Sequence, residues 1–201
     1  MLDDRVRSVL QRLEAEDARD DEAGKPTGGR SLAIAPTSGA LLVALCAGRP
    51  ACRVLEIGGS RGYSTIWLAS AVRPLAGRVT SLEADPAKLA VSAANVADAG
   101  LGDFVEILAG DAFETLPPLA GPFDVVFLDA WKDDYEALFA LARTKLVPGS
   151  VVAADNVVSH ASTLGAYSAA RQADPALVSV TVPLDNGLEV TSVLTDGLLS
   201  S

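Results

Sequence analysis

Apolar and polar positions alternate along the chain in blocks that predict strands and helices in turn. Short runs rich in valine, leucine and isoleucine predict buried strands at residues 54–57, 78–83, 104–108, 123–129 and 150–155. Segments with apolar residues at helical spacing lie between these runs. One of them, residues 86–99, predicts a helix that Gly100 terminates. Strands that alternate with helices in this way predict a parallel sheet covered by helices.

The N-terminal part of the chain has its own pattern. One face of a predicted amphipathic helix is formed by Leu2, Val6, Val9, Leu10 and Leu13. The polar, glycine-rich residues 20–29 then predict a mobile loop. Residues 39–45 predict a second helix, for which Thr37 or Ser38 would be the N-cap.

The C-terminal part predicts an antiparallel hairpin. Residues 185–187 are Asp-Asn-Gly, a strong turn signal, and they lie between alternating stretches at 178–182 and 188–193. We therefore expect one α/β domain over residues 1–201, with five parallel βα units closed by this hairpin and an N-terminal helix and loop over residues 1–30. The sheet would have seven strands, most of them parallel.

Composition and charge narrow the possible partners. The chain has a hydrophobic content of 49%, a formal net charge of −10 and a mean hydropathy of +0.30. An acidic surface disfavours nucleic acid and anionic membranes, because both are bound through basic patches. The two cysteines, Cys46 and Cys52, form neither a disulfide framework nor a metal-ligand pattern, so we expect reduced core residues. No signal core and no bilayer-spanning run is found, which predicts a cytoplasmic protein.

A glycine-rich turn follows the first predicted strand. Gly58, Gly59 and Gly62 separate this strand from helical residues 65–69. Such a turn lies at the carboxyl end of a strand, where open α/β sheets bind ligands, and the start of the next helix favours an anionic group. Ser60 stands where a dinucleotide motif has its second glycine, and no P-loop lysine follows. A purely structural turn without a ligand is the alternative.

Acidic residues recur where the predicted strands end. Glu83 lies about 20 residues past the glycine turn, where a carboxylate accepts hydrogen bonds from ribose hydroxyls in related sheets. A solvated acid at the end of a strand is the alternative for this residue. Asp111 ends the third strand and would contact an adenine or shape the loop.

The fourth and fifth strands end in oxygen ligands. Asp129 follows the most apolar strand of the chain, and Asp155 and Asn156 follow the next one. A carboxylate at the tip of a buried strand is costly unless it meets a cation or hydrogen bonds. If these strands are neighbours, the three side chains converge, and oxygen ligands without cysteine or histidine suit a hard cation such as Mg²⁺. Two separate helix caps are the alternative.

With these motifs in place, the chain resembles the class I S-adenosylmethionine-dependent O-methyltransferases. It is more narrowly similar to the metal-dependent group that contains catechol O-methyltransferase and caffeoyl-CoA O-methyltransferase. The first matching segment indicates only the wider class, whereas the third and fourth are more specific, and Trp131 brings the chain closer to the catechol enzyme. The matching segments are VLEIGGSRGYST, VTSLEAD, FDVVFLDAWKDDY, VPGSVVAADNV and NGLEVTSVLTDG.

The resemblance implies a role for each matching residue that would face the cofactor, S-adenosylmethionine. Glu83 would hold the ribose hydroxyls, Asp111 would lie near the adenine, and Asp129 would bind the cofactor as well as the metal and take part in catalysis. The methionine and ribose portion would be lined by Glu56, Gly58, Gly62, Tyr63 and Ser64.

The same resemblance implies the catalytic and substrate residues. Lys132 would be the general base, although an exposed loop lysine is the alternative from the residues alone. Trp131 would form a wall of the active site or pack in the core, and Glu189 would orient a substrate hydroxyl. Mg²⁺, or another divalent cation, would be bound by Asp129, Asp155 and Asn156.

Together these inferences predict Mg²⁺-assisted methyl transfer to a hydroxyl of a catechol-like or caffeoyl-type small molecule, within a Rossmann-like methyltransferase fold. The family and the N-terminal helix favour a homodimer. Residues 24–31 and 157–160 match no single subgroup, which leaves the acceptor open. Two other hypotheses remain: an NAD(P)-binding oxidoreductase, and a module that binds S-adenosylmethionine without catalysis.

Overall fold

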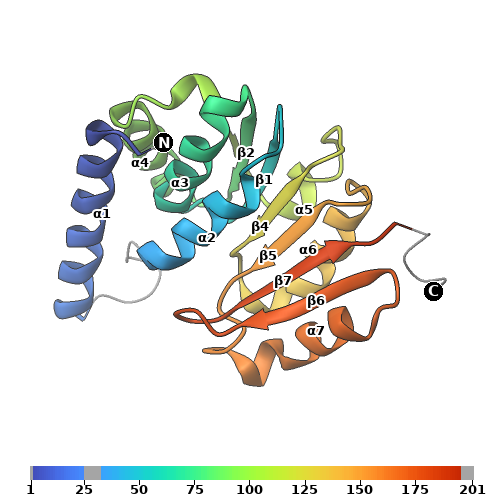
Figure 1. Ribbon diagram of the computed structural model, residues 1–201. Helices are drawn as coiled ribbons and strands as arrows, with labels where there is room; N and C mark the ends of the chain where they lie inside the picture. Colours follow the sequence, from blue (N-terminus) through green and yellow to red (C-terminus); the bar gives the residue numbers. More distant parts are fainter. Residues whose placement is uncertain (1, 25–32, 196–201) are drawn as a thin grey trace.

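The computed structural model describes residues 2–24 and 33–195, and they form a single seven-stranded sheet with helices on both faces (Figure 1). The strand order is β3-β2-β1-β4-β5-β7-β6. Strands β1 to β5 are parallel, whereas β7 runs antiparallel to both β5 and β6. The strands are β1 (Arg53–Ile57), β2 (Arg78–Glu83), β3 (Val105–Ala109), β4 (Val125–Leu128), β5 (Val151–Ala154), β6 (Leu177–Val182) and β7 (Leu188–Val193). The predicted fold class, with its C-terminal hairpin, is confirmed.

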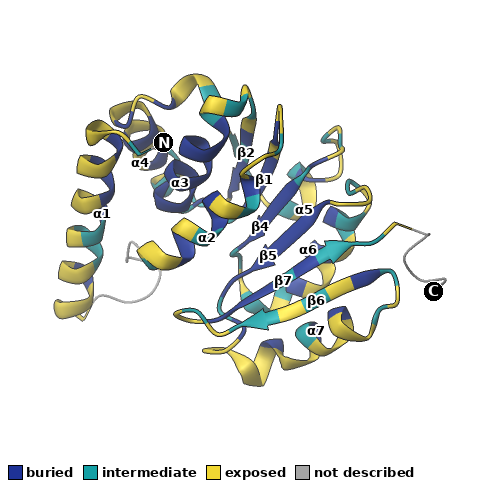
Figure 2. Ribbon diagram, viewed as in Figure 1, coloured by how far each residue is buried: buried dark blue, intermediate teal, exposed yellow. Residues whose placement is uncertain are grey.

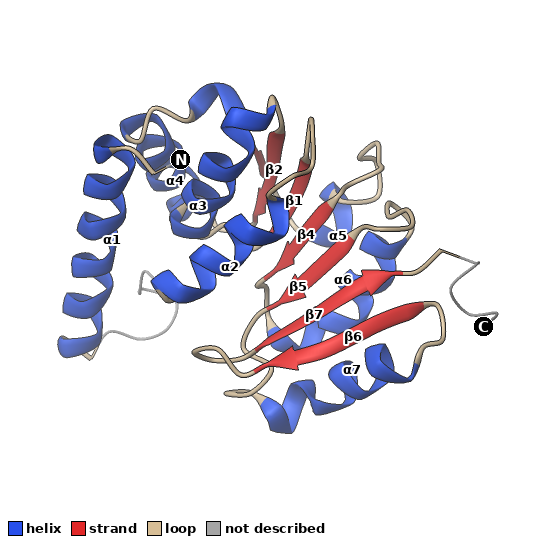
Figure 3. Cartoon of the chain, in the orientation of Figure 1, coloured by secondary structure: helices blue, strands red, loops and turns tan. Residues whose placement is uncertain are grey.

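The helices form two layers around the sheet (Figure 3). One apolar cluster joins α1, α2, α3 and α4 to one face of the sheet, and a second joins α5, α6 and α7 to the other. The central strands are buried between these layers (Figure 2). The helices are α1 (Asp4–Glu22), α2 (Pro36–Cys46), α3 (Tyr63–Val72), α4 (Pro86–Asp98), α5 (Ala112–Thr115), α6 (Tyr135–Arg143) and α7 (Ala161–Ala173), with short 3₁₀ turns η2 (Arg73–Leu75), η3 (Gly102–Phe104) and η4 (Lys132–Asp134).

The N-terminal helix forms as predicted, and Val6, Val9, Leu10 and Leu13 are its buried apolar residues. It continues to Glu22, so the predicted loop begins later than expected, and residues 25–32 of that loop lie outside the described residues.

The predicted cap of the second helix is wrong. Ala35 is the N-cap of α2 and makes no side-chain capping bond, so Thr37 and Ser38 lie inside the first turn. Pro36 begins the helix because its fixed φ and missing N–H suit the first helical position.

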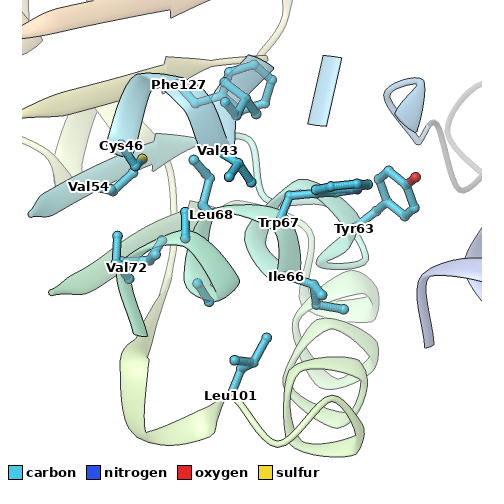
Figure 4. Packing of buried hydrophobic residues seen from close by; sticks show 14 of the residues in the cluster. Val43, Cys46, Val54, Tyr63, Ile66, Trp67, Leu68, Val72, Leu101 and Phe127 are labelled. Atoms are coloured by element: carbon cyan, nitrogen blue, oxygen red, sulfur yellow. The ribbon is translucent and has the colours of Figure 1, made fainter. Parts of the chain in front are cut away.

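Helix α2 packs closely on α3. A Cβ atom on Gly39 would lie 2.5 Å from Cε2 of Trp67, so only glycine allows this approach. Cys46 lies in the same cluster and Cys52 is also buried; both are free thiols, as expected (Figure 4). This packing fixes the helix that follows the glycine turn.

Among the described residues, no helix is long and apolar enough to cross a membrane. The homodimer and the cytoplasmic location expected from the sequence stay predictions.

Candidate functional site

The glycine turn (residues 58–62) joins β1 to α3 and leaves no room for side chains at two positions. Gly58 has φ +98°, and a Cβ there would lie 2.1 Å from the backbone oxygen of Asp129. Gly62 has φ +89°, and a Cβ there would lie 2.8 Å from Oγ of Ser92. Both positions need the freedom of glycine. The turn therefore abuts the end of β4 on one side and α4 on the other.

Glu56 is fully buried beneath this turn. Its carboxylate accepts hydrogen bonds from the hydroxyls of Ser64 at 2.6 Å, Thr65 at 2.5 Å and Ser81 at 2.5 Å. Burial raises the pKa of Glu56, and the three hydroxyls oppose that shift. Glu56 and Ser64 thus hold the start of α3 against β1 and β2. The contacts of Thr65 and Ser81 with Glu56 were not predicted from the sequence, although Ser81 is a polar residue inside an apolar strand.

Glu83 supports the turn from the neighbouring strand. Its carboxylate accepts hydrogen bonds from the backbone N–H of Ser60 at 2.6 Å and of Asp85 at 2.8 Å. The residue is 8% exposed, so the alternative of a solvated acid is wrong. Asp111 is exposed and caps α5 by accepting from the N–H of Phe113 at 2.8 Å, which makes it a loop-shaping residue in this structure.

Tyr63 connects the glycine turn to the N-terminal helix. Its hydroxyl donates to Oε1 of Glu14 at 2.6 Å, and its ring packs edge-on against Trp67. Burial raises the pKa of this hydroxyl above its ordinary value, and the bond to Glu14 adds to the shift. Helix α1 is therefore fastened to the first residue of α3.

The predicted convergence of acidic residues follows from strand register. Leu128 pairs with Ala154 in the parallel β4–β5 ladder, and the N–H of Asp155 donates to the oxygen of Leu128 at 3.0 Å. Asp129 and Asp155 therefore follow equivalent positions of adjacent strands, which lie about 4.8 Å apart. Asn156 comes next, with φ +64°. We call Asp129, Asp155 and Asn156 the acidic edge.

The two carboxylates of the acidic edge affect each other. Asp155 is 3% exposed, and burial raises its pKa to about 7, with the negative charge of Asp129 as the next cause. Neither aspartate is the N-cap of a helix or of a 3₁₀ turn among the described residues, so the helix-cap alternative is wrong. A cation between the two would offset the cost of burying their negative charges and the repulsion between them.

Among the described residues, no three histidine, cysteine, aspartate or glutamate side chains gather as a metal site. The acidic edge offers a smaller set: two carboxylates and the side-chain amide of Asn156. This set fits Mg²⁺, which is held by few protein oxygens and keeps positions for water and substrate. Burial is the main cause of the raised pKa of Asp155, followed by the charge of Asp129, while the charge of Lys132 lowers it.

Lys132 lies beside the acidic edge. Its ammonium donates to Oδ1 of Asp129 at 2.8 Å, to the oxygen of Ala130 at 3.1 Å and to the hydroxyl of Tyr135 at 3.1 Å. Tyr135 in turn donates to the backbone oxygen of Asp155 at 3.1 Å. The Lys132 side chain is only 19% exposed, so the alternative of an exposed loop lysine is wrong. The contact of Tyr135 with Lys132 was not predicted from the sequence, although residues three positions apart in a helical turn lie close together.

The two predicted substrate residues, Trp131 and Glu189, differ in how far they are buried. The Trp131 residue is 74% exposed, which excludes the core-packing alternative and leaves its indole free next to Lys132. Glu189 is fully buried and accepts from Ser179 and Thr181 at 2.6 Å each and from Gln172 at 3.0 Å. Glu189 pairs with Ala154, the residue before Asp155, and its carboxylate is bonded to side chains of β6 and α7. Its contact with a substrate hydroxyl stays a prediction.

A further contact was not predicted. Thr37 and Ser38, at the start of α2, donate their hydroxyls to Oδ2 of Asp185 at 2.6 Å and 2.7 Å. The sequence predicts Asp185 as part of the hairpin turn and gives no sign of its contact with α2.

Comparison with known proteins agrees with this geometry. The family model described as a methyltransferase domain matches residues 55–157. A catechol O-methyltransferase from Niastella koreensis is 40% identical over 71% of this chain, and one from Mycobacterium tuberculosis is 38% identical over 83%. The aligned region spans 64% and 76% of those two proteins, so it is less than two thirds of the first.

Solved structures share the whole fold. The O-methyltransferase TomG from Streptomyces achromogenes, involved in tomaymycin synthesis and solved in complex with S-adenosylmethionine, is 29% identical with a TM-score of 0.77. That match covers 91% of this chain and 89% of TomG. The segments that carry the glycine turn and the acidic edge lie inside the matched domain. The chain therefore belongs to the class I S-adenosylmethionine-dependent O-methyltransferases.

Proposed function

We propose that the protein transfers a methyl group from S-adenosylmethionine to a hydroxyl of a catechol-like small molecule, with the help of Mg²⁺. One observation supports this above the others: the strand register brings Asp129 beside Asp155 at the sheet edge that also bears the glycine turn. The NAD(P) alternative is not favoured, because the matching family and neighbours are methyltransferases.

The cofactor would lie along the glycine turn, with Glu83 at the ribose and Asp129 at the boundary with the metal. The acidic edge would hold the divalent cation. When bound, the cofactor supplies an electrophilic methyl group, and the cation stabilises negative charge on the acceptor oxygen. Tyr63, whose hydroxyl is bonded to Glu14, would bring α1 to this side of the site.

Lys132, as the neutral amine, would receive the proton of the acceptor hydroxyl at its Nζ atom and become the ammonium. The three acceptors around that nitrogen are Asp129, the backbone oxygen of Ala130 and the hydroxyl of Tyr135, and all three would stabilise the ammonium that forms. Because these acceptors are already in place, little rearrangement is needed when the charge appears.

The acceptor would lie against the exposed indole of Trp131, which offers a flat apolar face next to Lys132. Two adjacent hydroxyls on an aromatic ring match this arrangement, since one can face the base while both face the acidic edge. Holding the ring in one orientation would supply much of the rate, because orientation removes entropy from the barrier.

The test is a mass-shift assay with a simple catechol, S-adenosylmethionine and the purified protein. We expect EDTA to abolish the gain of one methyl group and added Mg²⁺ to restore it, while a phenol with a single hydroxyl reacts poorly. Calorimetry gives an independent measurement, with binding of S-adenosylmethionine and no binding of NAD. Full activity in chelator would remove the metal from the proposal, and binding of NAD alone would end it.

A further inference from the structure

Helix α2 receives its N-terminal carboxylate from a distant part of the chain. Its own N-cap, Ala35, makes no side-chain capping bond, and the first turn of α2 contains no acidic residue. Asp185 lies against this turn and accepts hydrogen bonds from the hydroxyls of Thr37 and Ser38, 148 and 147 residues away in sequence. A carboxylate at a helix N-terminus is stabilised by the helix dipole.

This contact stabilises the ionised form of the Asp185 carboxylate. The hydroxyl of Thr37 is the largest cause that lowers the pKa of Asp185, followed by the hydroxyl of Ser38. The backbone N–H of Ser38 contributes as well. Asp185 therefore serves α2 as a cap supplied from outside the helix, and it holds φ +54° in doing so.

The same turn binds the segment that follows the acidic edge. The N–H of Val157 donates to the oxygen of Gly187, and the N–H groups of Val158 and Ser159 donate to the oxygen of Asn186, each at 3.0 Å. These three donors come directly after Asn156. The start of α2 is thus connected through the β6–β7 turn to the residues that continue the acidic edge.

We infer that Asp185 is a positioning residue, which fixes the β6–β7 turn on α2 and thereby holds Asp155 and Asn156 in the geometry that binds the cation. Asn156 adopts a left-handed backbone conformation, which asparagine tolerates better than most residues, and the three N–H groups that follow it all donate to the turn. Asp185 is therefore bonded to α2, and the turn that it begins is bonded to the residues directly after Asn156.

This inference rests on the proposed function, because it assigns Asp185 a part in holding the acidic edge. The first variant is Asp185→Ala, which removes the carboxylate. The second is Thr37→Val with Ser38→Ala, which removes both hydroxyl donors from the opposite side. The matched control is Asp3→Ala, because Asp3 caps α1 by accepting from the N–H of Val6 at 2.9 Å and lies in no predicted site.

Two measurements are made on each protein without an acceptor: Mg²⁺ affinity by calorimetry, and amide hydrogen exchange at residues 157–159. In Asp185→Ala we expect Mg²⁺ affinity to fall by about 10- to 100-fold, the range for residues that support metal ligands. Exchange at 157–159 should become faster, because those amides donate to the turn that Asp185 anchors. The control should lose stability through its missing cap and keep wild-type values in both measurements.

Combining the variants gives a sharper result. If the hydroxyls act only through Asp185, adding Thr37→Val and Ser38→Ala to Asp185→Ala should change Mg²⁺ affinity no further. Asp185→Asn keeps an oxygen that can accept from the hydroxyls and should recover part of the lost affinity.

The possible results separate the two proposals. If the wild type binds Mg²⁺ and Asp185→Ala binds it equally well, the positioning role is overturned while the proposed function stands. If the wild type binds no Mg²⁺, that result by itself overturns the metal-assisted function. In that case faster exchange at 157–159 in Asp185→Ala still supports the link through the turn, and unchanged exchange overturns it.

Discussion

The ammonium nitrogen of Lys132 lies 2.8 Å from Oδ1 of Asp129. Asp129 also lies against the glycine turn, because its backbone oxygen lies where a side chain on Gly58 would be. One aspartate thus contacts the predicted base and the glycine turn, and it stands beside the next residue of the acidic edge, Asp155. A displacement of Asp129 should therefore affect more than one step of the reaction.

The first prediction concerns the base. We expect Lys132→Met to lower kcat by about 10²- to 10⁴-fold, the usual contribution of a general base. Affinity for S-adenosylhomocysteine should change little, because Lys132 is bonded to Asp129, Ala130 and Tyr135 and not to the glycine turn. Kinetics with a catechol and calorimetry with the cofactor product measure the two effects.

Lys145→Met is the matched control, because Lys145 donates to the backbone oxygen of Pro117 at 2.7 Å and lies away from the acidic edge. It should keep wild-type kcat. Equal rates in Lys132→Met and wild type would mean that another group accepts the proton.

The second prediction concerns Tyr135. Tyr135→Phe removes an acceptor of Lys132 and the donor to the backbone oxygen of Asp155, while the buried ring remains. We expect kcat to fall by about tenfold, since one hydrogen bond to a charged group contributes about 1.5 kcal/mol. The acceptor KM should stay within a small factor, because Tyr135 is 1% exposed and cannot reach the acceptor directly.

Tyr167→Phe is the comparison for this change. Tyr167 is also buried, with the guanidinium of Arg171 over its ring, and it is not bonded to Lys132. If both variants lost activity equally, the effect would come from packing, since the two rings contact each other edge-on.

The sheet and the acidic edge could be predicted because both follow from short-range patterns. Apolar runs locate the strands, and parallel strands place their carboxyl ends at one edge of the sheet. To predict that Asp129 and Asp155 lie near each other, only the assumption that β4 and β5 are neighbours was needed. Thr37 and Ser38 show the opposite case. Their partner Asp185 is about 150 residues away, and no local pattern indicates such a pairing.

Glu189 shows how strand alternation decides which face of the sheet a side chain meets. Leu188 and Val190, on either side of it, belong to the apolar cluster of α1 to α4, so strand alternation turns Glu189 to the other face. There Ser179, Thr181 and Gln172 satisfy its carboxylate. The alternation could be recognised in the sequence, but which face holds the site depended on the three-dimensional packing.

The third prediction concerns pH. Burial raises the pKa of Asp155 from an ordinary 3.8 to about 7, with the charge of Asp129 as the second cause. The folded, metal-free protein therefore holds this proton more tightly than the unfolded chain. The stability that the proton contributes is complete below about pH 4 and is lost as pH rises to about 7, at up to about 1.4 kcal/mol per pH unit.

Asp155→Asn isolates this effect, because its side chain stays neutral. In EDTA, the free energy of unfolding of wild type relative to Asp155→Asn should fall between about pH 4 and about pH 7, as measured by urea denaturation. Mg²⁺ should reverse the trend for wild type only, since the cation competes with the proton. Parallel pH profiles for the two proteins would show that Asp155 titrates normally.

The last prediction compares two glycines. Gly58 has φ +98°, and a Cβ there would lie 2.1 Å from the backbone oxygen of Asp129. Gly58→Ala should lower the free energy of unfolding by about 1–3 kcal/mol through backbone strain. Relief of the clash must displace Asp129, so affinity for both Mg²⁺ and S-adenosylhomocysteine should fall together.

Gly165→Ala provides the opposite expectation within the same fold. Gly165 lies inside α7, and a Cβ there would meet no atom within 4 Å outside the helix's own backbone. Alanine should raise the free energy of unfolding by about 0.5–1 kcal/mol, because it loses less backbone entropy in a helix. Binding of Mg²⁺ and of S-adenosylhomocysteine should stay unchanged. If Gly58→Ala weakened only one of the two ligands, Asp129 would not couple the glycine turn to the acidic edge.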